Sequence, residues 1–171
     1  MKFYRRSIRL KEYDYSQSGA YFVTIVTFQR ECMFGEIANS EMQLNGFGEI
    51  TDECWRAIPE HFTNVELGAY VVMPNHVHGI IVIHDVDDGR GTIYRAPTVE
   101  KFGKPTTDSL PTIIRTYKAG VARRIRREWN AKNIWKRNYY ERIIRNEREW
   151  DKIHWYIVSN PSSGRKMTKT Q

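Results

Sequence analysis

Two short apolar segments, separated by Pro74-Asn75, constrain the fold of this chain more than any other feature. Residues 65–73 and 76–84 are rich in valine and isoleucine, which favour β-strands. The Pro-Asn pair interrupts the apolar pattern, so the two strands either pair as a hairpin or form one bent strand. In both cases the segments supply the second and third main strands of the chain.

The rest of the chain alternates between strand and helix patterns. We predict a strand over residues 19–28, a loop or short hairpin over 30–44, a helix over 46–62, a helix from Asp108 or Ser109 to Arg127, a strand over 134–144 and a helix from Asn146 to about Ser159. With the two strands above, the order is βαββαβ followed by one helix. The predicted fold class is therefore α+β. It is a ferredoxin-like sandwich whose antiparallel sheet has helices on one face, plus a C-terminal helix.

The organisation of the chain predicts one domain over residues 1–161. Residues 85–107 lack periodicity and contain several glycines and prolines, which predicts a mobile loop or insertion. Residues 162–171 are polar and basic, which predicts a disordered tail. No apolar run has the roughly 18 residues of a membrane span, and the charged N-terminus lacks an apolar signal core, so we expect a cytoplasmic protein.

The second central segment opens with His76-Val-His78. Side chains along a strand alternate between faces, so both imidazoles point to one face while Val77 points into the core. Two imidazoles that share a small volume are typical of a metal site, and surface or buried structural histidines are the alternative. His84 has the same parity, but at about 3.3 Å per residue it lies roughly 20 Å further along, so we exclude it from the site.

Positive charge is concentrated in one part of a chain whose net charge is +7. Residues 111–150 contain twelve lysines and arginines against four glutamates, interleaved with aromatic side chains. This pattern favours a nucleic-acid partner, and a solvated basic helix is the alternative. Tyr139 and Tyr140 are adjacent in a predicted strand, so we expect one to pack and the other to stack on DNA. The predicted DNA-binding residues are Lys118, Arg123, Arg124, Arg126, Arg127, Lys136, Arg137, Tyr139 and Arg142.

The predicted last helix carries Tyr156 and Asn160 four residues apart, so their side chains share a helix face. The tyrosine hydroxyl is a candidate nucleophile, and the asparagine amide oxygen is a candidate ligand for a hard cation. A packed aromatic and a helix C-cap are the alternatives. A free tyrosine has a pKa of about 10 and needs activation. Lys152, one turn before Tyr156, is the candidate activator.

Three segments of the chain resemble one protein family. Met73-Pro-Asn-His-Val-His-Gly-Ile-Ile81 is similar to the HUH motif (histidine, bulky hydrophobe, histidine) of single-tyrosine transposases of the insertion-sequence type. Residues 135–147 and the ending Tyr156-Ile-Val-Ser-Asn-Pro161 resemble the REP-associated tyrosine transposase branch. The resemblance extends over about residues 19–161. It departs from the insertion-sequence enzymes at Asn160, because those carry a glutamine there as third metal ligand.

The resemblance implies a nucleoid-associated DNA transposase that cleaves and rejoins single-stranded DNA beside a hairpin, either REP-like or at the end of an element. Tyr156 would form a 5′-phosphotyrosine, and His76, His78 and Asn160 would hold Mg²⁺ or Mn²⁺. A homodimer, with the site inside one chain or shared between two, stays open. Two other classes also stay open. One is a non-catalytic hairpin DNA- or RNA-binding module, and the other is a metal-dependent phosphoesterase that uses water.

Overall fold

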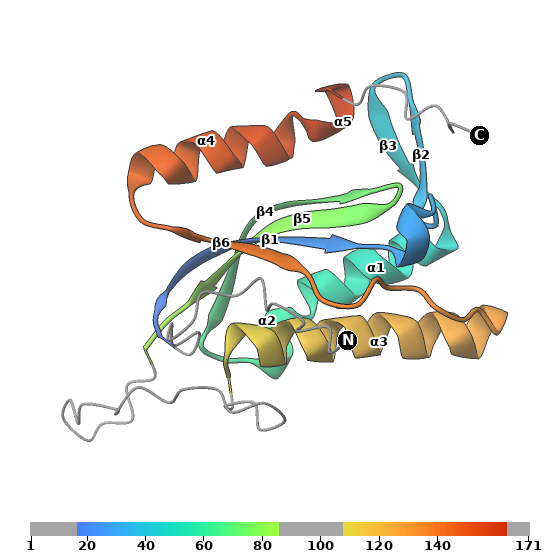
Figure 1. Cartoon of the computed structure of the whole chain (residues 1–171), viewed down its shortest axis with the longest axis horizontal. Helices are drawn as coiled ribbons and strands as arrows, with labels where there is room; N and C mark the ends of the chain where they lie inside the picture. Colours follow the sequence, from blue (N-terminus) through green and yellow to red (C-terminus); the bar gives the residue numbers. More distant parts are fainter. Residues whose placement is uncertain (1–16, 86–107, 164–171) are drawn as a thin grey trace, which may run out of the picture.

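The computed structural model describes residues 17–85 and 108–163 (Figure 1). Of the predicted loop over residues 85–107, all but residue 85 lies outside the described residues. The first two residues of the predicted tail, 162 and 163, belong to a short helix, and the rest of that tail also lies outside.

An antiparallel sheet of four strands occupies the centre of the described residues, in the order β4-β5-β1-β6. These strands are β1 (Gly19–Val26), β4 (Val65–Met73), β5 (His76–Ile83) and β6 (Tyr140–Ile144). A separate hairpin consists of β2 (Gly35–Ala38) and β3 (Glu41–Leu44). Met73 pairs with His76 directly across the Pro-Asn turn. The two central segments therefore form a hairpin and are not one bent strand.

Helices cover both faces of the sheet, as Figure 1 shows. One face carries α1 (Gly46–Arg56), the short α2 (Ile58–His61) and α3 (Leu110–Trp129), and the other carries α4 (Glu147–Val158). The 3-10 turn η1 (Phe28–Arg30) follows β1, and α5 (Asn160–Ser163) follows α4. This arrangement confirms the predicted α+β fold, a βαββαβ unit with one further helix. Within the described residues, none of the helices combines the length and the apolar character that a membrane span requires.

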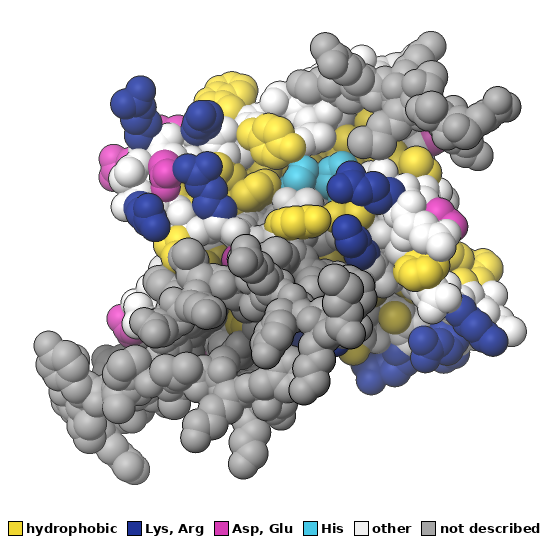
Figure 2. Space-filling model, in the orientation of Figure 1, with side chains coloured by type: hydrophobic (Ala, Val, Ile, Leu, Met, Phe, Trp, Pro, Cys, Tyr) yellow, Lys and Arg dark blue, Asp and Glu magenta, His cyan; other side chains and the backbone are white. Residues whose placement is uncertain are grey.

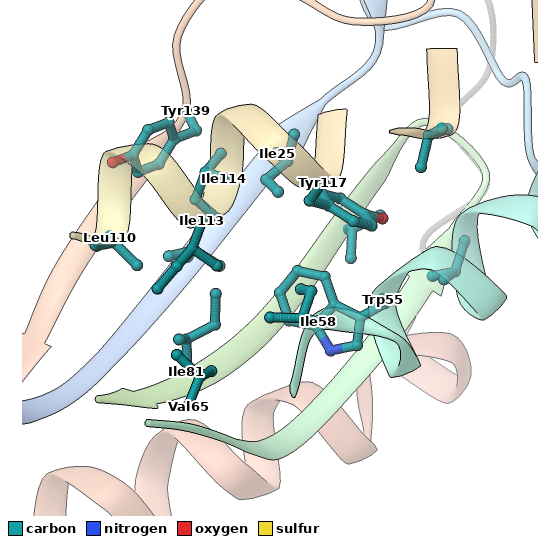
Figure 3. Close-up of a cluster of buried hydrophobic side chains, with 14 of the residues drawn as sticks. Ile25, Trp55, Ile58, Val65, Ile81, Leu110, Ile113, Ile114, Tyr117 and Tyr139 are labelled. Carbon is teal, nitrogen blue, oxygen red and sulfur yellow. The ribbon is translucent and has the colours of Figure 1, made fainter. Parts of the chain in front are cut away.

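Two separate clusters of buried apolar side chains hold these layers together. The larger cluster fills the space between the sheet and helices α1 to α3, where Trp55, Tyr117 and Ile81 are buried (Figure 3). The smaller cluster lies under α4 and consists of Ile80, Ile153 and Ile157, with partly buried apolar neighbours. Burying one such side chain fully stabilises the fold by about 1.5–3 kcal/mol. Each face of the sheet is therefore covered by its own core.

Alternation along β5 distributes its side chains between the two clusters. Val77 and Ile81 are in the larger cluster, whereas Ile80 is in the smaller one. The even-numbered positions of β5 therefore face α4, and this set includes His76 and His78. The predicted parity of the two histidines is confirmed.

Local chemistry explains where the elements begin and end. The Asn146 side chain accepts a hydrogen bond from the backbone N–H of Glu149, as predicted for the N-cap of α4. The predicted helix over 46–62 is wrong in one respect, because it breaks at Ala57 into α1 and α2. Pro59 lies in the first turn of α2, and a proline ring there clashes with the carbonyl of the preceding helical turn.

The predicted strand over 134–144 is also shorter than expected. Trp135 forms only an isolated bridge with Thr27, and β6 begins at Tyr140. Asn138 lies between them with φ of 70°, a left-handed conformation that a continuous strand does not contain.

Candidate active site

His76 and His78 lie side by side on the face of β5 that α4 covers. Their ring centroids are 4.4 Å apart. His78 is buried, with 6% of its surface exposed, and His76 is half-buried. On the face shown in Figure 2, histidine side chains reach the surface among hydrophobic and basic side chains. The pair is therefore sheltered by the fold but open on one side.

Helix α4 brings Tyr156 to this pair within the same chain. Ile153 and Ile157 anchor the helix on the sheet, and the Tyr156 hydroxyl lies 3.3 Å from Nε2 of His78. Phe22 of β1 stacks on the His78 ring at 5.4 Å and meets the Tyr156 ring edge-on at 6.1 Å. The sequence left open whether the tyrosine and the histidines meet in one chain or across a dimer. In the structure they meet in one chain.

Two neighbouring side chains fix the orientation of the imidazoles. Nδ1 of His76 lies 2.7 Å from Oδ1 of Asn75, whose own amide nitrogen donates to the carbonyl of Arg30. An amide oxygen only accepts, so Nδ1 of His76 carries the proton and Nε2 keeps its lone pair. Nδ1 of His78 lies 2.8 Å from Oγ1 of Thr24. With its proton on Nδ1, directed at Thr24, His78 leaves Nε2 free to accept a hydrogen bond from the Tyr156 hydroxyl.

Both imidazoles are in the neutral form that binds metals. Burial lowers the pKa of His76 to about 4, and the positive charge of Arg30 lowers it further in the same direction. Burial, followed by the neighbouring His76, lowers the pKa of His78 to about 3. Their Nε2 atoms fit the donor chemistry of a divalent metal site, with Nδ1 held by a second partner. Within residues 17–85 and 108–163, the structure contains no group of three His, Cys, Asp or Glu side chains placed to hold a metal ion.

The other two predicted site residues, Asn160 and Lys152, form no hydrogen bond with Tyr156 among the described residues. Helix α4 ends at Val158 and Asn160 opens the separate helix α5, so Asn160 and Tyr156 do not belong to one regular helix. Among the described residues, the Asn160 side chain has no hydrogen bond to either histidine. Lys152 is exposed on α4 and, among the same residues, has no hydrogen bond or ion pair with Tyr156. The ligand role of Asn160 and the activating role of Lys152 stay predictions.

Sequence reasoning missed Thr24, Asn75, Arg30 and Phe22. Asn75 could have been found, because an amide next to the first histidine is close enough to contact its ring. Thr24 is a polar residue in an apolar strand, which is a weak signal. It becomes informative only with the register that places Thr24 opposite His78. Nothing in the sequence indicated Arg30 or Phe22.

Two of the predicted DNA-binding residues, Lys118 and Tyr139, make contacts within the fold. The Lys118 ammonium donates to the backbone carbonyls of Lys136 at 2.8 Å and Asn138 at 3.1 Å, so it fastens the segment between α3 and β6. Burial lowers its pKa to about 8. Tyr139 is 7% exposed and belongs to the larger core, so it has no free ring face for a base. Of the adjacent pair, Tyr140 is the exposed one.

The other predicted DNA-binding residues lie at or near the surface, and two of them form ion pairs with acidic side chains. Arg124 pairs with Glu53 of α1 at 2.6 Å, and Arg142 pairs with Glu149 of α4 at 2.7 Å. These two guanidiniums are partly neutralised by their acidic partners. The remaining five side chains are exposed: Arg123, Arg126, Arg127, Lys136 and Arg137.

Comparison with solved structures supports the fold. The chain is similar to a REP-associated tyrosine transposase bound to a REP hairpin, with a TM-score of 0.59 and 20% sequence identity. The similarity covers 95% of this chain and 74% of that one. At this level of identity it shows a shared fold.

Comparison of sequences gives a nearer relative. No protein-family model matches the chain. An uncharacterized protein from Haemophilus influenzae is 42% identical over 161 residues, which cover 92% of this chain and 88% of the relative. The chain therefore belongs to the same protein family as this Haemophilus influenzae protein.

Proposed function

We propose that the protein is a tyrosine transposase that cleaves and rejoins single-stranded DNA beside hairpins. One observation carries the proposal: the Tyr156 hydroxyl lies 3.3 Å from Nε2 of a buried histidine, next to a second histidine. Tyr156 is also half exposed, so a substrate can reach it. An oriented hydroxyl beside an open pair of neutral imidazoles suits attack on a phosphate diester.

In the proposed reaction the Tyr156 oxygen attacks the phosphorus of the scissile phosphate. A bond forms between that oxygen and phosphorus, and the bond from phosphorus to the 3′ oxygen breaks. Tyr156 gives up its hydroxyl proton as it attacks, and the departing 3′ oxygen takes up one proton, so the products are a 5′-phosphotyrosine and a free 3′-hydroxyl. Because the covalent intermediate conserves the energy of the broken bond, the 3′-hydroxyl of another strand can reverse the step.

The chain's own residues orient the participants. Phe22 contacts both the His78 ring and the Tyr156 ring, so it limits their relative movement. Thr24 contacts Nδ1 of His78, and Asn75 contacts Nδ1 of His76. These contacts leave the Nε2 atom of each imidazole available for another partner. Those Nε2 atoms would hold Mg²⁺ or Mn²⁺, which polarises a bound phosphate and offsets its charge.

A DNA hairpin is the proposed partner because of charge and fold. Five exposed lysines and arginines of α3 and of the segment after it can contact phosphates. The protein of similar fold described above is bound to a REP hairpin. We therefore propose single-stranded DNA carrying a short hairpin as the substrate.

Covalent trapping tests the proposal. A pool of hairpin oligonucleotides with single-stranded flanks is labelled at the 3′ end, because a 5′-phosphotyrosine retains the downstream fragment. Wild-type protein should carry the label through denaturing electrophoresis, and Tyr156→Phe should not. Tyr140→Phe serves as the matched control and should keep the adduct. An adduct that survives in Tyr156→Phe contradicts the proposal, and cleavage by the wild type without any adduct points to water as the nucleophile.

A further inference from the structure

Tyr140 lies in line with the histidine pair across the sheet. Thr24 of β1 pairs with His78 of β5 on one side and with Tyr140 of β6 on the other. Residues directly opposite each other in antiparallel strands share a face, so Tyr140 is on the same face as His78. Neighbouring strands are about 4.8 Å apart, which places the two backbones roughly 10 Å from each other. β6 is the edge strand, so the row that starts at His78 ends at an open edge.

The Tyr140 ring is unusually available for a strand residue. It is 46% exposed, whereas the adjacent Tyr139 is 7% exposed. The Lys136 ammonium lies 5.9 Å from the centroid of the Tyr140 ring, within the range of a cation–π contact. An aromatic face and a positive charge are therefore presented together at the edge of the sheet.

The backbone that carries this pair is fixed from both sides. The Lys136 N–H donates to the carbonyl of Val26 in β1 at 2.9 Å. The Lys136 and Asn138 carbonyls accept from the Lys118 ammonium, which projects from α3. The Trp135 indole N–H in turn donates to the Lys118 carbonyl at 3.1 Å. The segment is thus held between the sheet and α3, so little ordering is required when a ligand binds.

We propose that Tyr140 is the stacking platform for a nucleobase of the strand whose phosphate lies at His78 and Tyr156. The inference rests on the proposed function and adds the residue that positions the strand. The ammonium of Lys136 occupies one side of the ring, which leaves the other side for the base. Lys136 is also exposed, so it can contact the phosphate next to that base.

A nucleobase fits this feature better than a protein partner does. The ring is one of several exposed aromatic side chains, and it has the Lys136 ammonium within cation–π range and Arg142 two positions further along β6. Single-stranded nucleic acids are bound by this combination of aromatic faces and basic side chains. The position is also continuous with the site to which the strand must deliver its phosphate.

A binding cycle in a Tyr156→Phe background tests the platform, because no adduct then forms. The probes are a short oligothymidylate and an abasic oligonucleotide of the same length, measured by fluorescence anisotropy. Tyr140→Ala should weaken binding of the oligothymidylate on the order of 10-fold, since stacking on one base is worth about 1–3 kcal/mol. It should leave binding of the abasic probe unchanged, and this unchanged binding also shows that the variant is folded. Tyr140→Phe keeps the ring and should bind both probes as the parent protein does.

Equal losses on both probes, or no loss on either, would overturn the inference. Should Tyr140→Ala not fold, an oligothymidylate containing iododeoxyuridine can be crosslinked by ultraviolet light to the Tyr156→Phe protein. The crosslinked peptide should contain Tyr140, and its absence from every crosslink also contradicts the inference. Binding is measured without the nucleophile, so this result is independent of adduct formation. Adducts on the wild type without base-dependent binding at Tyr140 would leave the proposed function standing and remove only the platform.

Discussion

The Tyr156 hydroxyl lies 3.3 Å from Nε2 of His78, although 78 positions separate the two residues in the sequence. The histidine belongs to the second strand of the central hairpin, and the tyrosine belongs to the last long helix. Their contact is intramolecular, so each copy of the chain contains both halves of the candidate site.

Thr24→Val should impair the site through the orientation of His78. Valine has nearly the shape of threonine but cannot bond Nδ1 of His78, which now lies 2.8 Å from Oγ1. Loss of such a supporting partner typically lowers metal affinity or activity about 10–100-fold. Adduct formation should fall within that range, and nitrogen NMR should show His78 shifting from the Nδ1–H to the Nε2–H tautomer. Thr24→Ser keeps the hydroxyl and should behave as the wild type. A fully active Thr24→Val protein with an unchanged tautomer would contradict this role.

Removing metal should show which of two roles Nε2 of His78 has in the reaction. Nε2 of His78 can serve as a metal ligand or as the acceptor of the Tyr156 proton. If it is a ligand, chelation abolishes adduct formation, Mn²⁺ restores it, and His76→Ala loses most Mn²⁺ binding in calorimetry. His84→Ala is the matched control, because His84 is exposed and contacts Glu66 at 3.2 Å, away from the site. Adducts that form equally well in chelator would favour proton acceptance over metal binding.

The buried histidines should make the protein less stable in mild acid. Their pKa values of about 4 and about 3 in the folded state lie below the ordinary value of 6.5, so the unfolded chain takes up these protons first. Above pH 6.5 both histidines are neutral in the folded and unfolded chain, so they do not lower the free energy of unfolding. As the pH falls from 6.5 toward 4, the unfolded chain binds these protons and the free energy of unfolding decreases. Chemical denaturation at pH 7, 6, 5 and 4.5 should show a falling free energy of unfolding. The double variant His76→Asn/His78→Asn should show a shallower slope, and an unchanged slope would contradict the assignment.

Two glycine-to-alanine substitutions should have opposite effects on stability. A Cβ at Gly79 would overlap Cζ2 of Trp55, a fully buried side chain. Overpacking of this kind costs about 1–3 kcal/mol or more, so Gly79→Ala should lower the melting temperature. Gly120 lies inside α3, and apart from the neighbouring backbone of its own helix no described atom comes within 4 Å of an added Cβ. Gly120→Ala should stabilise the protein by about 1 kcal/mol. Thermal unfolding of both variants measures the difference, and equal effects would contradict the packing at Trp55.

The features of the site that were predictable are those that depend on neighbouring residues. The shared face of His76 and His78 follows from alternation along a strand, whatever the strand pairs with. The start of α4 follows from the cap that Asn146 provides three residues before Glu149. Both are decided within a few positions of the chain.

What could not be predicted depends on pairing and docking between distant segments. The bond between Thr24 and His78 requires the register of β1 on β5, and a shift of one residue would remove it. Lysine and tyrosine occur both in DNA-binding surfaces and in internal contacts, so residue type alone does not say which role Lys118 and Tyr139 have. Only the position of α3 against the segment before β6 places one under a pair of carbonyls and the other among apolar side chains.

Helix α4 packs on a small core of its own, so the helix that carries Tyr156 can open while the strand that carries the histidines stays folded. Ile80, Ile153 and Ile157 form that core, whereas the other face of the sheet is held by a much larger cluster. Elements with few buried contacts open at a lower free energy than the whole fold. A molecule whose last helix has lifted away retains the sheet, the imidazole pair and the basic surface. Such a form would keep the paired imidazoles on the sheet but would lack the Tyr156 hydroxyl beside His78.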